Sequence, residues 1–151
     1  MGELSHDYLH SAEAAMRIAN HLPGVRLITT LRNPVDRAFS EYLFLIRNGW
    51  TKLPFEKAIE KWPELIEKGL YFRHLSTYYQ LFERSQIGVF FFNDFISDPE
   101  NFAKAIFDFL GIPFSNRIDY NKRVLPASKP RNFVVARLIK ITAKLARCIF
   151  R

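Results

Sequence analysis

The run from Arg26 to Ile46, RLITTLRNPVDRAFSEYLFLI, constrains the fold more than any other part of the sequence. It predicts a strand, a tight turn and a helix. The apolar, β-prone residues 27–31 are typical of a strand covered on both faces. Asn33 can cap the helix that follows, and Pro34 suits its first position. Apolar residues then recur at helical spacing, and we expect them to face the core: Val35, Ala38, Phe39, Tyr42 and Ile46.

Two polar side chains of this run form a candidate anion site. Arg32 follows the strand, at the edge where ligands bind in open α/β sheets. Ser40 lies two turns into the helix and off its apolar stripe. A guanidinium and a hydroxyl can share one phosphate or sulfate. On the residues alone, the alternative is that Arg32 pairs with Asp36 and that Ser40 is only solvated.

The flanking sequence predicts more helices and one more strand. In chain order, we expect helices over 11–22, over 55–66 with a kink or break at Pro63, over 71–82 and over 98–110, and a strand over 87–92. Asn93 and Asp94 then stand at the carboxyl end of that strand. Helices that alternate with two apolar strands indicate a parallel α/β sheet.

Charge and composition narrow the possible functions. Of 22 Lys and Arg residues, nine lie from Lys122 onward, where there is no acidic residue, which leaves 13 basic against 15 acidic residues elsewhere. Nucleic-acid binding by the whole domain is therefore not indicated. One cysteine excludes an internal disulfide framework, and no metal-ligand spacing is present. The first residues do not resemble a signal peptide and no run spans a bilayer, so we expect a cytoplasmic protein.

The segment LITTLRNPVDRAFSEY closely resembles the 3′-phosphate-binding segment of sulfotransferases that use 3′-phosphoadenosine 5′-phosphosulfate. In that family an Arg follows the strand, a Pro comes two residues later, and a Ser comes eight residues after the Arg. Arg32, Pro34 and Ser40 match this pattern. The resemblance implies that Arg32 and Ser40 hold the 3′-phosphate of the co-substrate. It also implies sulfuryl transfer, without a metal, to a hydroxyl or amine acceptor such as a carbohydrate.

Three further segments extend the resemblance over most of Gly2 to Arg131. GELSHDYL is similar to the family's G-E-K-T/S-P-x-Y stretch, KGLYFRHLSTYYQLF to its Gly-x-Tyr helix, and IGVFFFNDFISDPENFAKAIFDFLGIP to its second-strand segment. The implied fold class is α/β: a partial P-loop-type three-layer domain with a parallel sheet flanked by helices.

The sequence departs from the family pattern in two ways. The family's first strand and phosphate loop, with their Lys and catalytic base, are absent from these residues. We therefore expect an exposed sheet edge that favours self-association or a second chain. Leu4 and His6 stand where the family has Lys and Pro. His6 is a weak candidate base, because a surface His near a terminus is more often inert, and the catalytic residue is otherwise unknown.

A second basic segment, Ser128 to Arg131, is a candidate lid over the nucleotide. In related enzymes a basic loop closes there, and Lys129 and Arg131 could serve, with Lys122 and Arg123 as alternates. The alternative is a solvated linker. Asp94 could pair with a cation of the site, although a structural role suits it better.

The expected organisation is a sulfotransferase-like domain over 1–132 and a basic amphipathic helix over 133–151. The helix could dock on the domain or lie on an anionic membrane surface. Two other functions therefore remain open: a non-catalytic nucleotide- or sulfated-glycan-binding remnant, and a peripheral membrane protein bound through this helix.

Overall fold

The computed structural model describes residues 2–115 and 118–120, which divide into two compact units. The first unit comprises residues 2–33 together with the described residues from Leu70 to Tyr120. The second comprises Pro34–Gly69. The predicted C-terminal helix over 133–151 lies outside the described residues. The expected boundary between domains at residue 132 stays a prediction.

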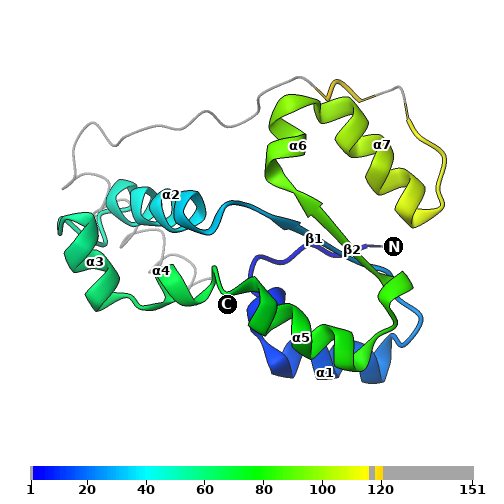
Figure 1. Cartoon of the computed structure of the whole chain (residues 1–151), viewed down its shortest axis with the longest axis horizontal. Helices are drawn as coiled ribbons and strands as arrows, with labels where there is room; N and C mark the ends of the chain where they lie inside the picture. Colours follow the sequence, from blue (N-terminus) through cyan, green and yellow to red (C-terminus); the bar gives the residue numbers. More distant parts are fainter. Residues whose placement is uncertain (1, 116–117, 121–151) are drawn as a thin grey trace, which may run out of the picture. The chain divides into compact units, whose positions relative to one another are not determined.

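The first unit holds both strands. Its elements are η1 Tyr8–His10, α1 Ala12–His21, β1 Leu27–Leu31, α5 Tyr71–Leu81, η2 Arg84–Gln86, β2 Ile87–Phe91, α6 Phe92–Ser97 and α7 Pro99–Leu110. β1 and β2 pair in parallel, from Leu27 opposite Ile87 to Leu31 opposite Phe91. Figure 1 shows α1 and α5 on one side of this sheet and α6 and α7 on the other. The predicted α/β class, with a parallel sheet between helices, is confirmed.

Each face of the sheet packs against its helices in a different way. On one face, Ile87 joins Ala15, Tyr78 and Phe82 in a buried cluster. On the other, Gly88 lets α7 approach closely, since a Cβ at this position would lie 2.9 Å from the ring of Phe109. Aromatic rings from β2, α6 and α7 pack together over β2 on that face.

Two expectations about the strands are wrong. β1 is not covered on both faces, because Ile28 is 40% exposed and Thr30 is exposed too. The rings of α7 that reach this face pack at Gly88 and on Phe90 of β2 instead. β2 also ends one residue early, and Phe92 begins α6 directly, so Asn93 and Asp94 lie in a helix.

The sheet has two strands within the described residues, so each of them keeps one edge without a strand partner there. Self-association or a second chain at such an edge stays a prediction.

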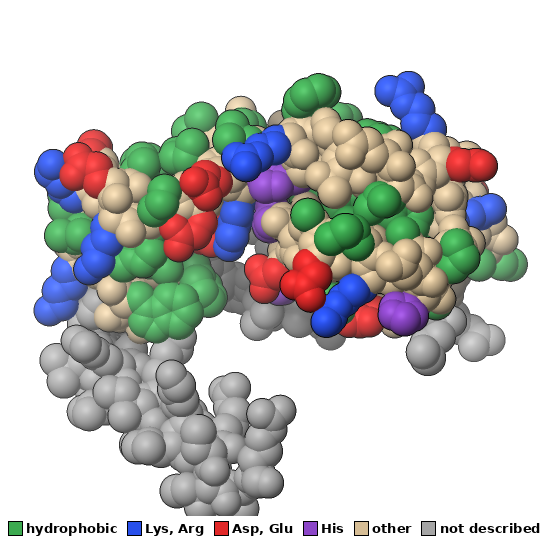
Figure 2. All heavy atoms as spheres, turned by 90° about the horizontal axis from the view of Figure 1, so that it is seen from below, with side chains coloured by type: hydrophobic (Ala, Val, Ile, Leu, Met, Phe, Trp, Pro, Cys, Tyr) green, Lys and Arg blue, Asp and Glu red, His purple; other side chains and the backbone are tan. Residues whose placement is uncertain are grey.

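Apolar side chains also reach the surface among charged ones, as Figure 2 shows for one face. Exposed fractions of 87% for Phe72 and 68% for Val35 are examples.

The second unit consists of α2 Pro34–Arg47, α3 Phe55–Lys61 and α4 Glu64–Glu67. Trp62 and Pro63 separate α3 from α4, as the sequence predicts. The core holds Tyr42, Leu45, Ala58 and Leu65. The stripe expected on α2 is thus shifted: Ala38 and Tyr42 are buried, but Val35 and Phe39 are 68% and 46% exposed.

Candidate functional site

Arg32 lies at the carboxyl end of the sheet, as the sequence predicts. The last paired residues are Leu31 and Phe91, so Arg32 and Phe92 directly follow the two strands. Their side chains meet there: the guanidinium carbon of Arg32 lies 5.2 Å from the centre of the Phe92 ring. This is a cation–π distance, so the Phe92 ring is a packing partner of the guanidinium.

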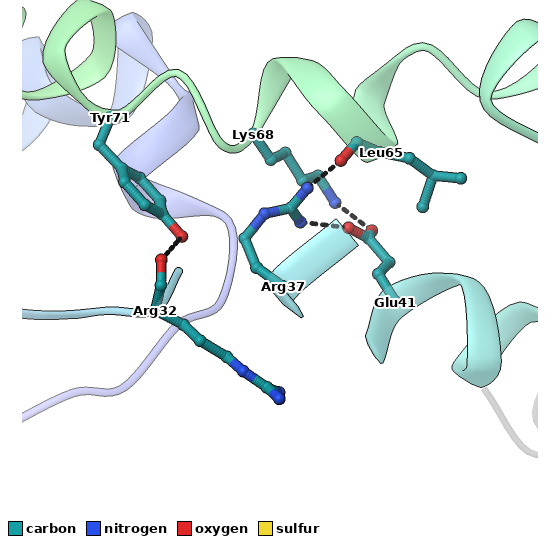
Figure 3. A network of polar contacts seen from close by, with 6 residues as sticks. All are labelled: Arg32, Arg37, Glu41, Leu65, Lys68 and Tyr71. Atoms are coloured by element: carbon teal, nitrogen blue, oxygen red, sulfur yellow. Dashed lines mark hydrogen bonds and ion pairs between the residues drawn. The ribbon is translucent and has the colours of Figure 1, made fainter. Parts of the chain in front are cut away.

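The backbone of Arg32 is fixed by a residue from another part of the chain. The hydroxyl of Tyr71, the first residue of α5, donates a hydrogen bond of 2.9 Å to the Arg32 carbonyl oxygen. Figure 3 shows the Arg32 side chain extending away from Tyr71. Among the residues that the structure describes, its N–H groups have no hydrogen-bond or ion-pair partner. Arg32 as a residue is half-buried, and a guanidinium with open donors is suited to a planar, bidentate contact with an oxyanion.

Ser40 lies in α2 of the second unit, on the exposed side of the helix. Its hydroxyl has no hydrogen-bond partner within the described part of the chain, and the expectation that it lies off the buried stripe is confirmed. Arg32 belongs to the first unit. That the two side chains share one phosphate stays a prediction.

The other basic residue near Ser40 in the sequence, Arg37, is already engaged. Its Nη1 lies 2.5 Å from Oε2 of Glu41, and its Nη2 donates to the Leu65 carbonyl. Lys68 Nζ lies 2.9 Å from Oε1 of Glu41 (Figure 3). Burial raises the pKa of Glu41, but hydrogen bonds and charge from Lys68 and Arg37 outweigh it and hold that pKa below its ordinary value. These contacts join α2 to α4.

The remaining candidates are not brought to Arg32 by any described contact. His6 is exposed in the segment before η1, and its ring has no hydrogen-bond, ion-pair or aromatic-ring partner among the described residues. Asp94 lies in the first turn of α6, and its carboxylate has no ion-pair partner within the same described ranges. Lys129 and Arg131, with their alternates Lys122 and Arg123, lie outside the described residues.

Sequence reasoning gave no role to the two residues that hold Arg32. The sequence presents Tyr71 as part of an apolar helical stripe and of the Gly-x-Tyr segment, and the latter is the available signal. Phe92 gave none, because it continues an apolar run that predicts a strand.

Within residues 2–115 and 118–120, no His, Cys, Asp and Glu side chains gather in a way that could hold a metal ion. No helix there is long and apolar enough to cross a bilayer.

Comparisons with known proteins point to one family. The sulfotransferase domain family matches residues 9–144. A crystal structure of a sulfotransferase from Alicyclobacillus acidocaldarius is similar, with a TM-score of 0.70 and 29% identity over 95% of this chain and 59% of that one.

Two curated relatives are heparan sulfate enzymes. The bifunctional heparan sulfate N-deacetylase/N-sulfotransferase 1 of Xenopus laevis is 30% identical over 134 residues, 80% of this chain and 15% of that protein. The heparan sulfate glucosamine 3-O-sulfotransferase 6 of Mus musculus is 29% identical over 119 residues, 73% of this chain and 34% of that protein. The chain thus spans a minor part of these relatives. Because the domain family matches nine-tenths of its length, the chain belongs to the sulfotransferase family.

Proposed function

We propose that this chain is part of an enzyme that transfers a sulfuryl group from 3′-phosphoadenosine 5′-phosphosulfate, and that Arg32 and Ser40 bind the 3′-phosphate. One observation carries the proposal. Arg32 is half-buried and its guanidinium contacts the Phe92 ring, yet its N–H donors have no partner among the described residues. An arginine that served packing alone would be expected to spend its donors on carbonyls or carboxylates.

The chemistry of the group fits this pair. A phosphate monoester carries close to two negative charges near neutral pH and offers three acceptor oxygens. Arginine can meet two of these oxygens with parallel N–H donors, and a serine hydroxyl can donate to the third. Adenosine 3′,5′-bisphosphate is therefore the natural probe of the site, since it carries the 3′-phosphate without the reactive group.

In the proposed reaction, the bound co-substrate supplies an activated sulfuryl group. A bond forms between sulfur and the acceptor oxygen or nitrogen, the bond to the departing bisphosphate breaks, and the acceptor loses one proton. Arg32 binds and orients the nucleotide and neutralises charge on its 3′-phosphate. The base that takes the proton is not assigned, and His6 remains the candidate from the sequence.

The acceptor class is proposed from the relatives. They are named as an N-sulfotransferase and a glucosamine 3-O-sulfotransferase of heparan sulfate. We therefore propose a carbohydrate amine or hydroxyl as the acceptor. Incubating the chain with labelled co-substrate and a glucosamine-containing polysaccharide tests this step, and label that stays on the nucleotide would favour a binding protein without transfer activity.

The decisive experiment is calorimetric titration of the whole chain with adenosine 3′,5′-bisphosphate and with adenosine 5′-monophosphate. We expect tighter binding of the bisphosphate. Arg32→Ala should weaken that binding by roughly tenfold to a hundredfold, the range for a lost charge-assisted hydrogen bond, and Ser40→Ala by less. Neither change should alter binding of the monophosphate.

The matched control is Arg17→Ala. Arg17 is an exposed arginine of α1 whose guanidinium lies 3.2 Å from Glu13. Its loss removes the same charge from the chain and should leave affinity unchanged. If Arg17→Ala and Arg32→Ala weaken binding equally, general charge attraction explains the affinity and the proposed site is wrong. Lys129→Ala and Arg131→Ala in the same titration test the predicted lid.

A further inference from the structure

We propose that Tyr71 and Phe92 are positioning residues that hold Arg32 ready for the 3′-phosphate. The inference rests on the proposed function, because it concerns the same guanidinium. It goes further in assigning a role to two side chains that the Arg-Pro-Ser pattern does not include. Each acts on a different part of Arg32: Tyr71 on the backbone and Phe92 on the side chain.

Tyr71 fixes the point where the chain leaves β1. Its hydroxyl donates 2.9 Å to the carbonyl oxygen of Arg32, across 39 residues of sequence. The Tyr71 ring belongs to the first turn of α5, so the bond ties the strand end to the start of that helix. Since this carbonyl precedes the turn into α2, its orientation decides the direction of the Arg32 backbone.

Phe92 fixes the direction of the guanidinium. Its ring is itself held in place, because it lies 5.7 Å from the ring of Phe95, which lies 5.5 Å from the ring of Phe102. The guanidinium carbon of Arg32 lies over this ring at 5.2 Å, and a cation–π contact of this kind spends none of the N–H donors on a hydrogen bond. Those donors are the ones that a bidentate phosphate contact needs.

The physical benefit is pre-organisation. An unsupported arginine loses rotamer freedom when a ligand immobilises it, and this cost is subtracted from the affinity. In the arrangement seen here, much of that freedom is already lost on folding. Removing either support should therefore weaken recognition of the 3′-phosphate without affecting the rest of the nucleotide.

The test measures 3′-phosphate selectivity, defined as the affinity for adenosine 3′,5′-bisphosphate divided by that for adenosine 5′-monophosphate. Tyr71→Phe deletes one hydroxyl and Phe92→Leu deletes the aromatic face. We expect each to lower the selectivity by roughly threefold to tenfold, the effect of one neutral hydrogen bond or cation–π contact. Phe92→Tyr keeps the aromatic face and should therefore have the same selectivity as the wild-type chain.

Tyr78→Phe is the matched control. It removes a hydroxyl from the same helix that also donates to a backbone carbonyl, that of Tyr8, at 2.5 Å. This bond does not involve Arg32, so its loss should reduce stability and leave selectivity unchanged. A selectivity loss in Tyr78→Phe equal to that in Tyr71→Phe would overturn the inference.

Double variants separate this inference from the proposed function. If Tyr71 acts through Arg32, adding Tyr71→Phe to Arg32→Ala should cause no further loss of selectivity. If Arg32→Ala leaves the selectivity unchanged, both the site and the inference are wrong. If Arg32→Ala abolishes it while Tyr71→Phe and Phe92→Leu do not alter it, the site stands and only the positioning role is wrong.

Discussion

The ion-pair network of the second unit gives a sharp stability prediction, tested by Glu41→Gln. The change keeps the side-chain shape and removes the charge that Arg37 and Lys68 share. The three side chains are 26%, 18% and 29% exposed, so the network is neither a surface pair nor fully buried. Exposed pairs contribute about 0–1 kcal/mol, and breaking a buried pair costs about 3–5 kcal/mol. We expect Glu41→Gln to lower the free energy of unfolding by about 1–3 kcal/mol.

Urea unfolding at neutral pH measures this loss, and thermal unfolding should show a lower melting temperature, by about 2–4 °C for each kcal/mol. Glu60→Gln is the matched control. Glu60 pairs with Lys57 at 3.0 Å, but both side chains are more than 60% exposed. Its removal should change stability by less than about 0.5 kcal/mol.

The pH dependence of the Glu41 effect follows from the lowered pKa. Burial alone would raise the pKa of Glu41, but Lys68 and Arg37 lower it overall, so the unfolded chain takes up the proton first as the pH falls. The stabilisation is complete above the ordinary carboxyl pKa and is lost as pH falls through the lowered pKa of the folded chain. The gap between wild type and Glu41→Gln should therefore shrink as the pH falls below the ordinary glutamate pKa of about 4.3. A gap that is the same there as at neutral pH would refute the reasoning, as would equal losses in Glu41→Gln and Glu60→Gln.

Substitutions at three positions test the packing and helix ends of the first unit. Gly88→Ala should cost about 1–3 kcal/mol by urea unfolding, because the new Cβ would lie 2.9 Å from the Phe109 ring; an unchanged midpoint would contradict this close approach. Ser11→Ala should cost about 1 kcal/mol in the same assay, since the Ser11 hydroxyl accepts from the Ala14 N–H at 3.1 Å and caps α1. Gly111→Ala should cost about 1–2 kcal/mol, because Gly111 has a φ of 66°, whereas Gly111→Asn should cost less in a parallel melt.

Local signals predicted the elements of this fold well. Ser11 caps α1 through its side chain, and Gly111 ends α7 in the left-handed conformation. Pro63 separates two short helices as expected. Each of these signals acts within a few residues of the chain, so a single sequence is enough to read it.

Features decided by packing were harder to predict. The apolar run IGVFFF gives no sign of where β2 stops, and Phe92 begins a helix instead. Val35 and Phe39 fit the apolar stripe of α2 by spacing, yet they are exposed while Leu45 is buried. The bond from Tyr71 to Arg32 joins positions 39 residues apart, which no local pattern encodes.

The candidate site also depends on packing that the sequence does not reveal, and the three arginines of its segment show this. Arg26, Arg32 and Arg37 lie within one segment and look alike in the sequence. In the structure, Arg26 donates 2.6 Å to the Phe109 carbonyl, and Arg37 is engaged by Glu41 and the Leu65 carbonyl. Arg32 differs from both, because the described residues supply no acceptor for its side-chain donors, although its guanidinium contacts the Phe92 ring. Composition and spacing cannot make this distinction, since it depends on which acceptors the fold brings near each guanidinium. The resemblance to sulfotransferases selects the same arginine on independent grounds, and this agreement makes Arg32 the first residue to test.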